Sequence, residues 1–364
     1  MQIFYLKEEF LDNFLGILSR EYRVYLPFKV AGKTIKCDFG FQLPTDEYMY
    51  KIYSPSASPA FVFNPYRTVE PLRTFYAYPK EKVASYFNSA QENLQPEKKA
   101  AVLGVKNCDL FSMKIQDFVF LEGVTQDPLY EKRRRETLLI SGDCPAFKES
   151  CFCLALGIAP YVTEGFDLNF SPLNDGFLVD VGSPKGEEVA GKCGKCLNPA
   201  TSAQVSARQQ KRDAVAEKLK QHLKPHQIPP KEALQEIVTR GYNSQVWPEE
   251  ALTCVECGGC NFMCDTCHCF LLSDERFGSV NEKVRLWDAC LFANFARVAG
   301  GANPLKYRPQ RLRNRYLKKF DFFPQNLGLA ACCGCGRCID VCPGKIDIRR
   351  ILKRLNDEKS LSTP

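Results

Sequence analysis

Hydrophobic side chains recur with helical spacing close to the start of the chain, and short apolar runs follow them. The segment 8–18 is amphipathic, and its apolar face comprises Phe10, Leu11, Phe14, Leu15 and Leu18. Runs at 100–105, 138–142 and 176–182 are short and apolar, and several are bounded by Gly, Pro, Asn or Asp, as is typical of strands. Helix and strand signals together predict a mixed α/β domain over residues 1–200.

The pattern changes after residue 200. Residues 203–223 are mostly polar but keep an apolar stripe at helical spacing, formed by Val215, Leu219 and Leu223. A proline-rich stretch then interrupts the chain before a second short helix predicted at 231–240. We interpret residues 201–249 as a helical connector between two domains.

The last part of the chain alternates helical segments with cysteine-rich loops. Residues 250–350 are therefore predicted to form an all-helical domain, and residues 351–364, which end in DEKSLSTP, a C-terminal tail. The fold class that follows is α+β, with an N-terminal α/β domain and a helical C-terminal domain.

Composition removes several classes of function. The 364 residues are 45% hydrophobic and 25% charged, which is typical of a folded protein. A net charge of +7 is too weak to indicate nucleic-acid binding without a basic stripe or a reading motif. No stretch approaches 18 uninterrupted apolar residues, so we expect no membrane insertion. The first ten residues lack the apolar run of a signal peptide, and we expect a cytoplasmic protein.

Cysteine is the unusual component. The chain has 19 cysteines, and in a reducing compartment clustered cysteines bind metal more often than they form disulfides. Two quartets share one spacing, C-x2-C-x2-C-x3-C, at residues 254–264 and 332–342. Zinc sites favour separated C-x-x-C pairs, whereas three cysteines at a repeated three-residue step are typical of [4Fe-4S] binding. The sequence thus predicts two [4Fe-4S] clusters.

The spacing also predicts how the quartets share their clusters. Three thiolates on one tight loop can wrap three corners of a cluster, while the fourth lies further along and points away. In two-cluster ferredoxins this fourth cysteine ligates the other cluster. The predicted ligands of the first cluster are Cys254, Cys257, Cys260 and Cys342. Those of the second cluster are Cys332, Cys335, Cys338 and Cys264. Asp265 stands where proline usually follows such a quartet, and as a negative charge it is expected to lower the potential of its cluster.

The motifs resemble one particular family. The similar runs are CVECGGCNFMCDTCHCF, RLWDAC, VAGGANP, RLRNRYL and CCGCGRCIDVCPGKI, and further upstream GVKNCDL, DPLYEKRRRE, ESCFC, EGFDL and GFLVDVGSPKG. This set resembles the iron–sulfur beta subunit of cytoplasmic sulfhydrogenases and the related iron–sulfur subunit of anaerobic sulfite reductase. The resemblance covers most of residues 100–347.

That resemblance implies an electron-transfer subunit. In the family, such a subunit relays electrons between a flavoprotein that uses NAD(P)H and a second redox unit. The second unit is a hydrogenase, a sulfite reductase or a heterodisulfide-reductase assembly. We therefore expect partners of these two kinds. The alternative is that the N-terminal domain is itself a reductase of sulfur compounds, with an active-site cluster of its own.

Four cysteines of the N-terminal region lie in motifs that take part in the resemblance. We predict that Cys108, Cys144, Cys151 and Cys153 hold a third [4Fe-4S] cluster. The alternative is a set of buried thiols, because free cysteine packs well in apolar cores.

The remaining cysteines have no assigned role. For Cys267, Cys269, Cys290 and Cys333 we expect packing beside the clusters, with ligation by Cys267 or Cys269 left open. His268 is expected to donate a hydrogen bond near a cluster and not to bind iron. The C-x-x-C pair Cys193 and Cys196 is compatible with a dithiol, with ligation of the N-terminal cluster, or with neither.

Overall fold

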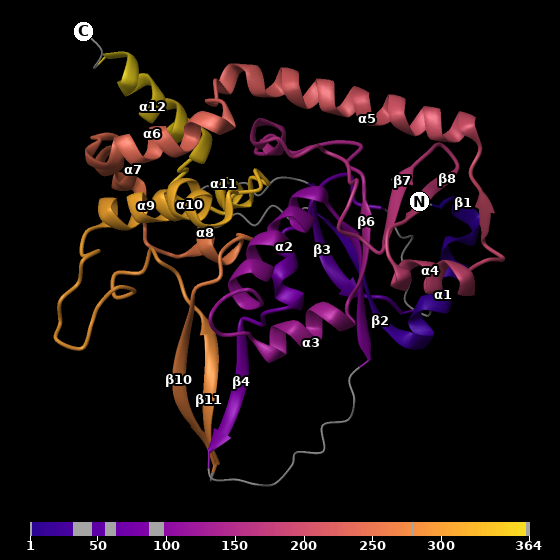
Figure 1. The fold of residues 1–364 in the computed structure, drawn as a ribbon, viewed down its shortest axis with the longest axis horizontal. Coiled ribbons are helices and arrows are strands. Elements are labelled where there is room, and N and C mark those ends of the chain that lie inside the picture. The colour runs from indigo at the N-terminus through magenta and orange to yellow at the C-terminus, as the bar shows by residue number, and fades with distance from the viewer. Residues whose placement is uncertain (1, 32–45, 55–62, 87–97, 279, 362–364) are drawn as a thin grey trace.

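A mixed sheet dominates the first half of the computed structural model, which describes residues 2–31, 46–54, 63–86, 98–278 and 280–361 (Figure 1). The eight strands follow the order β3-β2-β5-β6-β7-β8-β1-β9. Their bounds are β1 (Ile3–Lys7), β2 (Tyr22–Ala31), β3 (Asp46–Ile52), β5 (Lys99–Val105), β6 (Leu138–Gly142), β7 (Leu168–Pro172), β8 (Gly176–Val181) and β9 (Leu197–Pro199). Strands β2, β5, β6 and β7 run parallel, while β3, β8 and β1 pair antiparallel with their neighbours.

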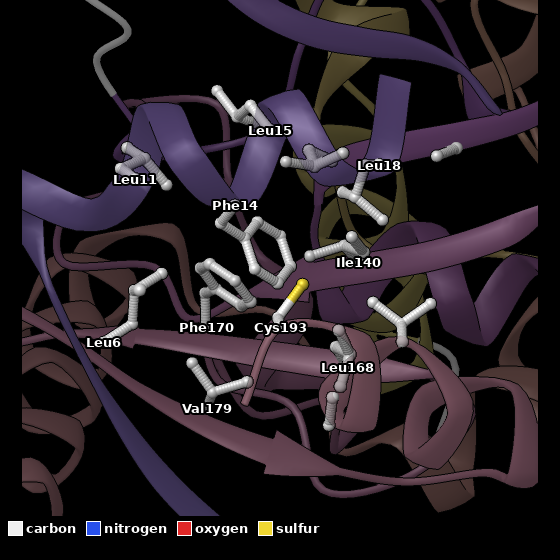
Figure 2. Packing of buried hydrophobic residues seen from close by; sticks show 14 of the residues in the cluster. Leu6, Leu11, Phe14, Leu15, Leu18, Ile140, Leu168, Phe170, Val179 and Cys193 are labelled. Atoms are coloured by element: carbon white, nitrogen blue, oxygen red, sulfur yellow. The ribbon is translucent and has the colours of Figure 1, made fainter. Parts of the chain in front are cut away.

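Both faces of this sheet are covered, which explains why its central strands are apolar runs. Along β5, Ala101 and Leu103 pack into one core, whereas Val102 and Val105 pack into another on the opposite face. The first core holds the apolar face of α1 (Leu11–Glu21) and part of α4 (Pro184–Lys192) (Figure 2). The second holds residues of α2 (Asn107–Phe120) and α3 (Pro128–Glu136). The predicted helix at 8–18 and the predicted strands at 100–105, 138–142 and 176–182 are confirmed.

Helices dominate the second half. They are α5 (Ser202–Leu223), α6 (Leu234–Arg240), α7 (Val246–Glu250), α8 (Gly259–Phe262), α9 (Arg308–Leu317), α10 (Phe323–Leu327), α11 (Arg337–Asp340) and α12 (Ile348–Leu361). Short 3-10 segments are η1 (Glu8–Phe10), η2 (Leu72–Phe75), η3 (Cys153–Leu156), η4 (Lys224–His226), η5 (Lys231–Ala233), η6 (Gly241–Asn243) and η7 (Ala251–Thr253), and η8 (Lys318–Phe322) is a π-helical turn. Within the described part of the chain, no helix has the length and apolar character needed to cross a membrane.

The expectation that residues 250–350 are all-helical is wrong. Strands β10 (Phe270–Phe277) and β11 (Val280–Trp287) form an antiparallel hairpin in this region. Strand β4 (Lys80–Tyr86), from the N-terminal region, pairs with β11 and completes a three-stranded sheet (Figure 1). Gly278, with a φ of 61°, lies just after β10, where the chain turns towards β11.

The predicted connector and tail both belong to the packed structure. Helix α5 is braced against the sheet by a hydrogen-bonded ion pair of 2.6 Å between Arg208 and Asp180 of β8. Further along, Val238 of α6 and Trp247 of α7 lie in the same buried core as Leu352 of α12. Because α12 runs to Leu361, residues 351–361 are not a frayed tail.

Candidate metal centre

The two cysteine quartets fold in the same way. In each, a loop reaches a glycine in the left-handed region, Gly258 (φ 70°) or Gly336 (φ 75°), and a one-turn helix follows, α8 or α11. The third cysteine of each motif, Cys260 or Cys338, lies on that helix. The two short helices pack against each other, so the loops meet.

The quartets exchange their fourth members around two neighbouring cavities. The first cavity is lined by Cys254, Cys257, Cys260, Cys338 and Cys342. The second is lined by Cys264, Cys332, Cys333, Cys335 and Cys338. Cys342 of the second motif thus lies with three cysteines of the first, and Cys264 of the first lies with those of the second. This grouping is the one that crossed ligation requires.

Glycine is required where these loops are crowded. A Cβ on Gly336 would lie 2.3 Å from the carbonyl oxygen of Ser150, and one on Gly258 would lie 2.8 Å from the ring of Phe292. A Cβ on Gly334 would lie 2.5 Å from Cα of Cys153. The second cysteine loop is therefore pressed against residues 150–153 of the N-terminal region.

Buried cations surround the cysteines. Arg315 lines both cavities and donates to the carbonyl of Cys260 over 3.0 Å. Nζ of Lys319 lies 3.3 Å from Sγ of Cys264. Nε of Arg67 donates to the carbonyl of Cys335 over 2.5 Å. The side chains of Arg67, Arg315 and Lys319 are all almost fully buried. A buried positive charge needs a negative partner, and Arg67 has one in Asp340.

Burial and hydrogen bonding act in opposite directions on the pKa values of the thiols. Burial raises the pKa of Cys260 and Cys332 to about 12 and that of Cys338 to about 11. Hydrogen bonding with Cys333, followed by the charges of Arg337 and Arg67, lowers the pKa of Cys335 to about 6. Because the thiolate is the ligating form, metal binding at the first three must release protons. The donor set and the surrounding cations thus fit an anionic iron–sulfur cluster at each cavity.

Asp265 is not the isolated negative charge that the sequence suggests. It is fully buried and accepts a hydrogen bond of 2.6 Å from Arg337, which also donates to Asp109 over 2.7 Å. Burial raises the pKa of Asp265 well above its usual value. Burial acts in the same direction on Asp109, but Arg337 outweighs it and holds the pKa of that carboxyl below its usual value. Arg337 is thus a positive partner for the charge that the sequence places at Asp265.

The four N-terminal cysteines gather beside the second quartet. Cys108, Cys151 and Cys153 lie in one buried cluster with Cys333 and Cys335. Sγ of Cys151 is 3.9 Å from the carbonyl oxygen of Cys335. Cys144 is half-buried, and its pKa of about 12, raised mainly by burial, also reflects the nearby Cys151.

Other cysteines separate into two groups. Cys193 and Cys196 lie in the sheet core, away from the buried cluster that holds Cys108. Figure 2 shows Cys193 near Phe14 and Phe170. This position favours packing for the C-x-x-C pair. Cys267, Cys269 and Cys290 instead line a third cavity together with His268. Over the described ranges, no three His, Cys, Asp or Glu side chains are grouped so that they could hold a single metal ion, and this includes both quartets.

Several residues of the site could not be found by spacing. Arg67 and Arg73 come from a segment about 200 residues before the first quartet, yet Arg73 donates to the carbonyls of Asn261 and Phe262 over 3.0 Å. The basic stretch at 308–319 is visible in the sequence and could have indicated cations near the cysteines. Only the structure shows which of its side chains are buried and which are exposed. Arg311, Arg315 and Lys319 are buried, whereas the Arg308 side chain is 45% exposed.

Comparison with known proteins defines first the class and then the family. Residues 253–346 match the family model of the 4Fe-4S dicluster domain, so the region around the cavities is that of an iron–sulfur protein. Over 292 residues the chain is 30% identical to sulfhydrogenase 2 subunit beta of Pyrococcus furiosus, covering 80% of this chain and 84% of that protein. The chain therefore belongs to the family of sulfhydrogenase beta subunits, as the motifs predict. No solved structure matches it.

Proposed function

We propose that this chain is the electron-transfer subunit of a multi-subunit oxidoreductase. It relays electrons between an NAD(P)H-linked flavoprotein and a terminal redox unit of the hydrogenase, sulfite reductase or heterodisulfide-reductase type. The observation that carries the proposal is the exchange of fourth cysteines between two adjacent cavities, inside a region that matches a dicluster domain. When bound, [4Fe-4S] clusters accept and release single electrons.

The proposed ligands are those of the crossed assignment. Cys254, Cys257, Cys260 and Cys342 hold one cluster, and Cys264, Cys332, Cys335 and Cys338 hold the other. Support comes from the cysteines that line each cavity and from the cations beside them. In this arrangement Arg315, which lines both cavities, and Lys319, which lines the second, offset the negative charge of the thiolates.

A third cluster on Cys108, Cys144, Cys151 and Cys153 extends the relay. Its support is the buried group that Cys108, Cys151 and Cys153 form with Cys333 and Cys335, together with the nearby Cys144, which adds to the effect of burial in raising the pKa of Cys153. Nζ of Lys106, fully buried at the start of α2, donates to the carbonyl of Asp143, next to Cys144. A cation in that position favours an anionic centre among these cysteines.

Electrons exchange with a partner most readily at the first quartet. Cys257 is exposed, whereas Cys264, Cys332 and Cys335 are buried. Near Cys257, the side chains of Val255 and Val341 are 63% and 37% exposed. Exposed apolar residues grouped beside a redox site are typical of a protein interface. We define Val255 and Val341 as the apolar patch.

The test is to purify the native complex anaerobically and to identify its other chains. The isolated chain is then mixed with NADPH, with and without the co-purified flavoprotein. We expect the chain to be reduced only when the flavoprotein is present. The measurement is the loss of visible absorbance. Reduction of the isolated chain by NADPH alone, or purification of the native protein without partners, would contradict the proposal.

A second candidate function is supported by a separate cavity. A cavity of about 820 Å³ lies beside the start of α2 and is lined by Asn107, Ile158 and Lys231, among others. Cys332 is the only cysteine among the described residues that line it. Its volume suits a small ligand, so the alternative is a reductase of sulfur compounds at this place. Turnover of sulfite or polysulfide by the isolated, chemically reduced chain would favour this alternative, and absence of turnover would favour the relay.

A further inference from the structure

Three cysteines outside both quartets converge on a cavity of their own. Cys267 and Cys269 come just before β10, and Cys290 comes just after β11. Pairing of Phe270 with Trp287 closes the hairpin at this end, and the amide of Asp288 donates to the carbonyl of Cys269 over 2.9 Å. The hairpin therefore places Cys269 and Cys290 at one edge, where they line the cavity with Cys267 and His268.

One buried side-chain amide donates hydrogen bonds to two of these thiols. Nδ2 of Asn261 donates to Sγ of Cys290 over 3.1 Å and to Sγ of Cys267 over 3.7 Å. Asn261 is 1% exposed and lies on α8, between two ligand positions of the first quartet. Amide donors to sulfur are a common feature of iron–sulfur sites.

The charges at this cavity are all positive. Arg315, Lys318 and Lys319 line it, and no carboxylate is found among its described lining residues. Arg315 is only 4% exposed, and its Nε is buried without a hydrogen-bond partner. A buried cation with a free donor favours an anionic occupant.

We propose that Cys267, Cys269 and Cys290 hold an additional [4Fe-4S] cluster, with His268 as its fourth ligand. Nδ1 of His268 donates to the carbonyl of Thr266 over 3.3 Å, which leaves Nε2 to bind iron. A ring nitrogen anchored on a carbonyl is the usual arrangement of a metal-binding histidine. This site goes beyond the two clusters of the dicluster domain and does not depend on the N-terminal cysteines.

A cluster fits better than a zinc ion. No group of cysteines and histidines in the described segments is arranged to hold one ion, whereas the cysteines of a cluster each bind a different iron atom. The site also shares Arg315 with both quartet cavities. One arginine thus lines all three of the cysteine-lined cavities.

The experiment compares iron and acid-labile sulfide in the full chain, purified anaerobically, with those in Cys290→Ala. We expect Cys290→Ala to lose about four iron atoms per chain and to keep the EPR signals of the remaining clusters. Cys193→Ala, which alters a fully buried cysteine of the sheet core, is the matched control and should keep all its iron. Equal iron content in Cys290→Ala and the parent would overturn the proposal, as would loss of a single zinc ion in place of iron.

A second variant covers the case in which Cys290→Ala disturbs the fold and loses more iron. Cys269→Ala changes a side chain that is only partly buried. A loss of about four iron atoms in Cys269→Ala supports the site, and an unchanged iron content overturns it. His268→Ala should keep the cluster but change its EPR spectrum, and an unchanged spectrum removes His268 from the ligand set. Cys254→Ala tests the first quartet separately, so failure of the proposed function and failure of this inference can be told apart.

Discussion

Arg315 is the residue on which the three cysteine-lined cavities meet. Its side chain lines all three, and its pKa is raised well above the usual value because the neighbouring cysteines, Cys260 and Cys338 first among them, outweigh the opposing effect of burial. A fixed positive charge at this point stabilises a centre more strongly after it has gained an electron. Arg315 is therefore expected to set potentials and not only to fill space.

Replacement of Arg315 should lower the reduction potentials of the neighbouring clusters. We expect Arg315→Gln to shift at least one midpoint potential downward by about 60 mV, which corresponds to about 1.4 kcal/mol for one electron. The measurement is an EPR-monitored redox titration. Arg315→Lys keeps the charge and should shift the potential less. Equal potentials in the parent and Arg315→Gln would show that the charge has no such effect.

At the scale of elements, the cysteine loops depend on tight turns that bring each short helix to its cavity. Gly336 starts α11 with a φ of 75°, and its Cα faces the backbone of Ser150. Any side chain here meets both backbone strain and a steric clash. The strain and the clash would act on the second quartet and on residues 150–153.

We therefore expect Gly336→Ala to reduce the iron content by about four atoms per chain and to destabilise the fold by about 1–3 kcal/mol. Iron analysis and thermal unfolding measure the two effects. Gly300→Ala is the control, because a Cβ there has no neighbour within 4 Å and the backbone is not in the left-handed region. If Gly336→Ala and Gly300→Ala behave alike, the turn is not required.

Local sequence patterns predicted many of the elements. Helices α1 and α5 follow from apolar residues at helical spacing, strands β5, β6 and β8 follow from short apolar runs, and the quartets follow from cysteine spacing. The β10–β11 hairpin was missed because cysteines flank it and its third partner, β4, is about 190 residues earlier. The Asp109–Arg337–Asp265 group joins three distant segments, so no local pattern could predict that Asp265 is paired.

Across the whole molecule, the cysteine sites extend from an exposed edge to the interior. Cys257 is exposed beside the apolar patch, Cys332 and Cys335 of the second quartet are buried, and Cys108, Cys151 and Cys153 lie in one buried cluster with Cys335. This order suits a relay that meets a partner protein at the first quartet. It also explains why loops from both halves of the chain are packed together.

A charge in the apolar patch should slow exchange with that partner. We expect Val255→Glu to lower the rate of reduction by the co-purified flavoprotein, or of oxidation by the terminal unit, by about tenfold, the equivalent of about 1.4 kcal/mol. Iron content should be unchanged, because Val255 is 63% exposed. Val124→Glu, at a fully exposed position in the turn between α2 and α3, is the control. Unchanged rates with both partners in Val255→Glu would place the exchange surface elsewhere.

The most direct test of the account is EPR and Mössbauer spectroscopy of the chain with each fourth cysteine removed. If the ligation is crossed, Cys342→Ala loses the same cluster as Cys254→Ala, and Cys264→Ala loses the same cluster as Cys332→Ala. Each variant should retain the spectrum of the other cluster. If Cys342→Ala instead matches Cys332→Ala, or if the parent contains no [4Fe-4S] signal, the central claim is contradicted.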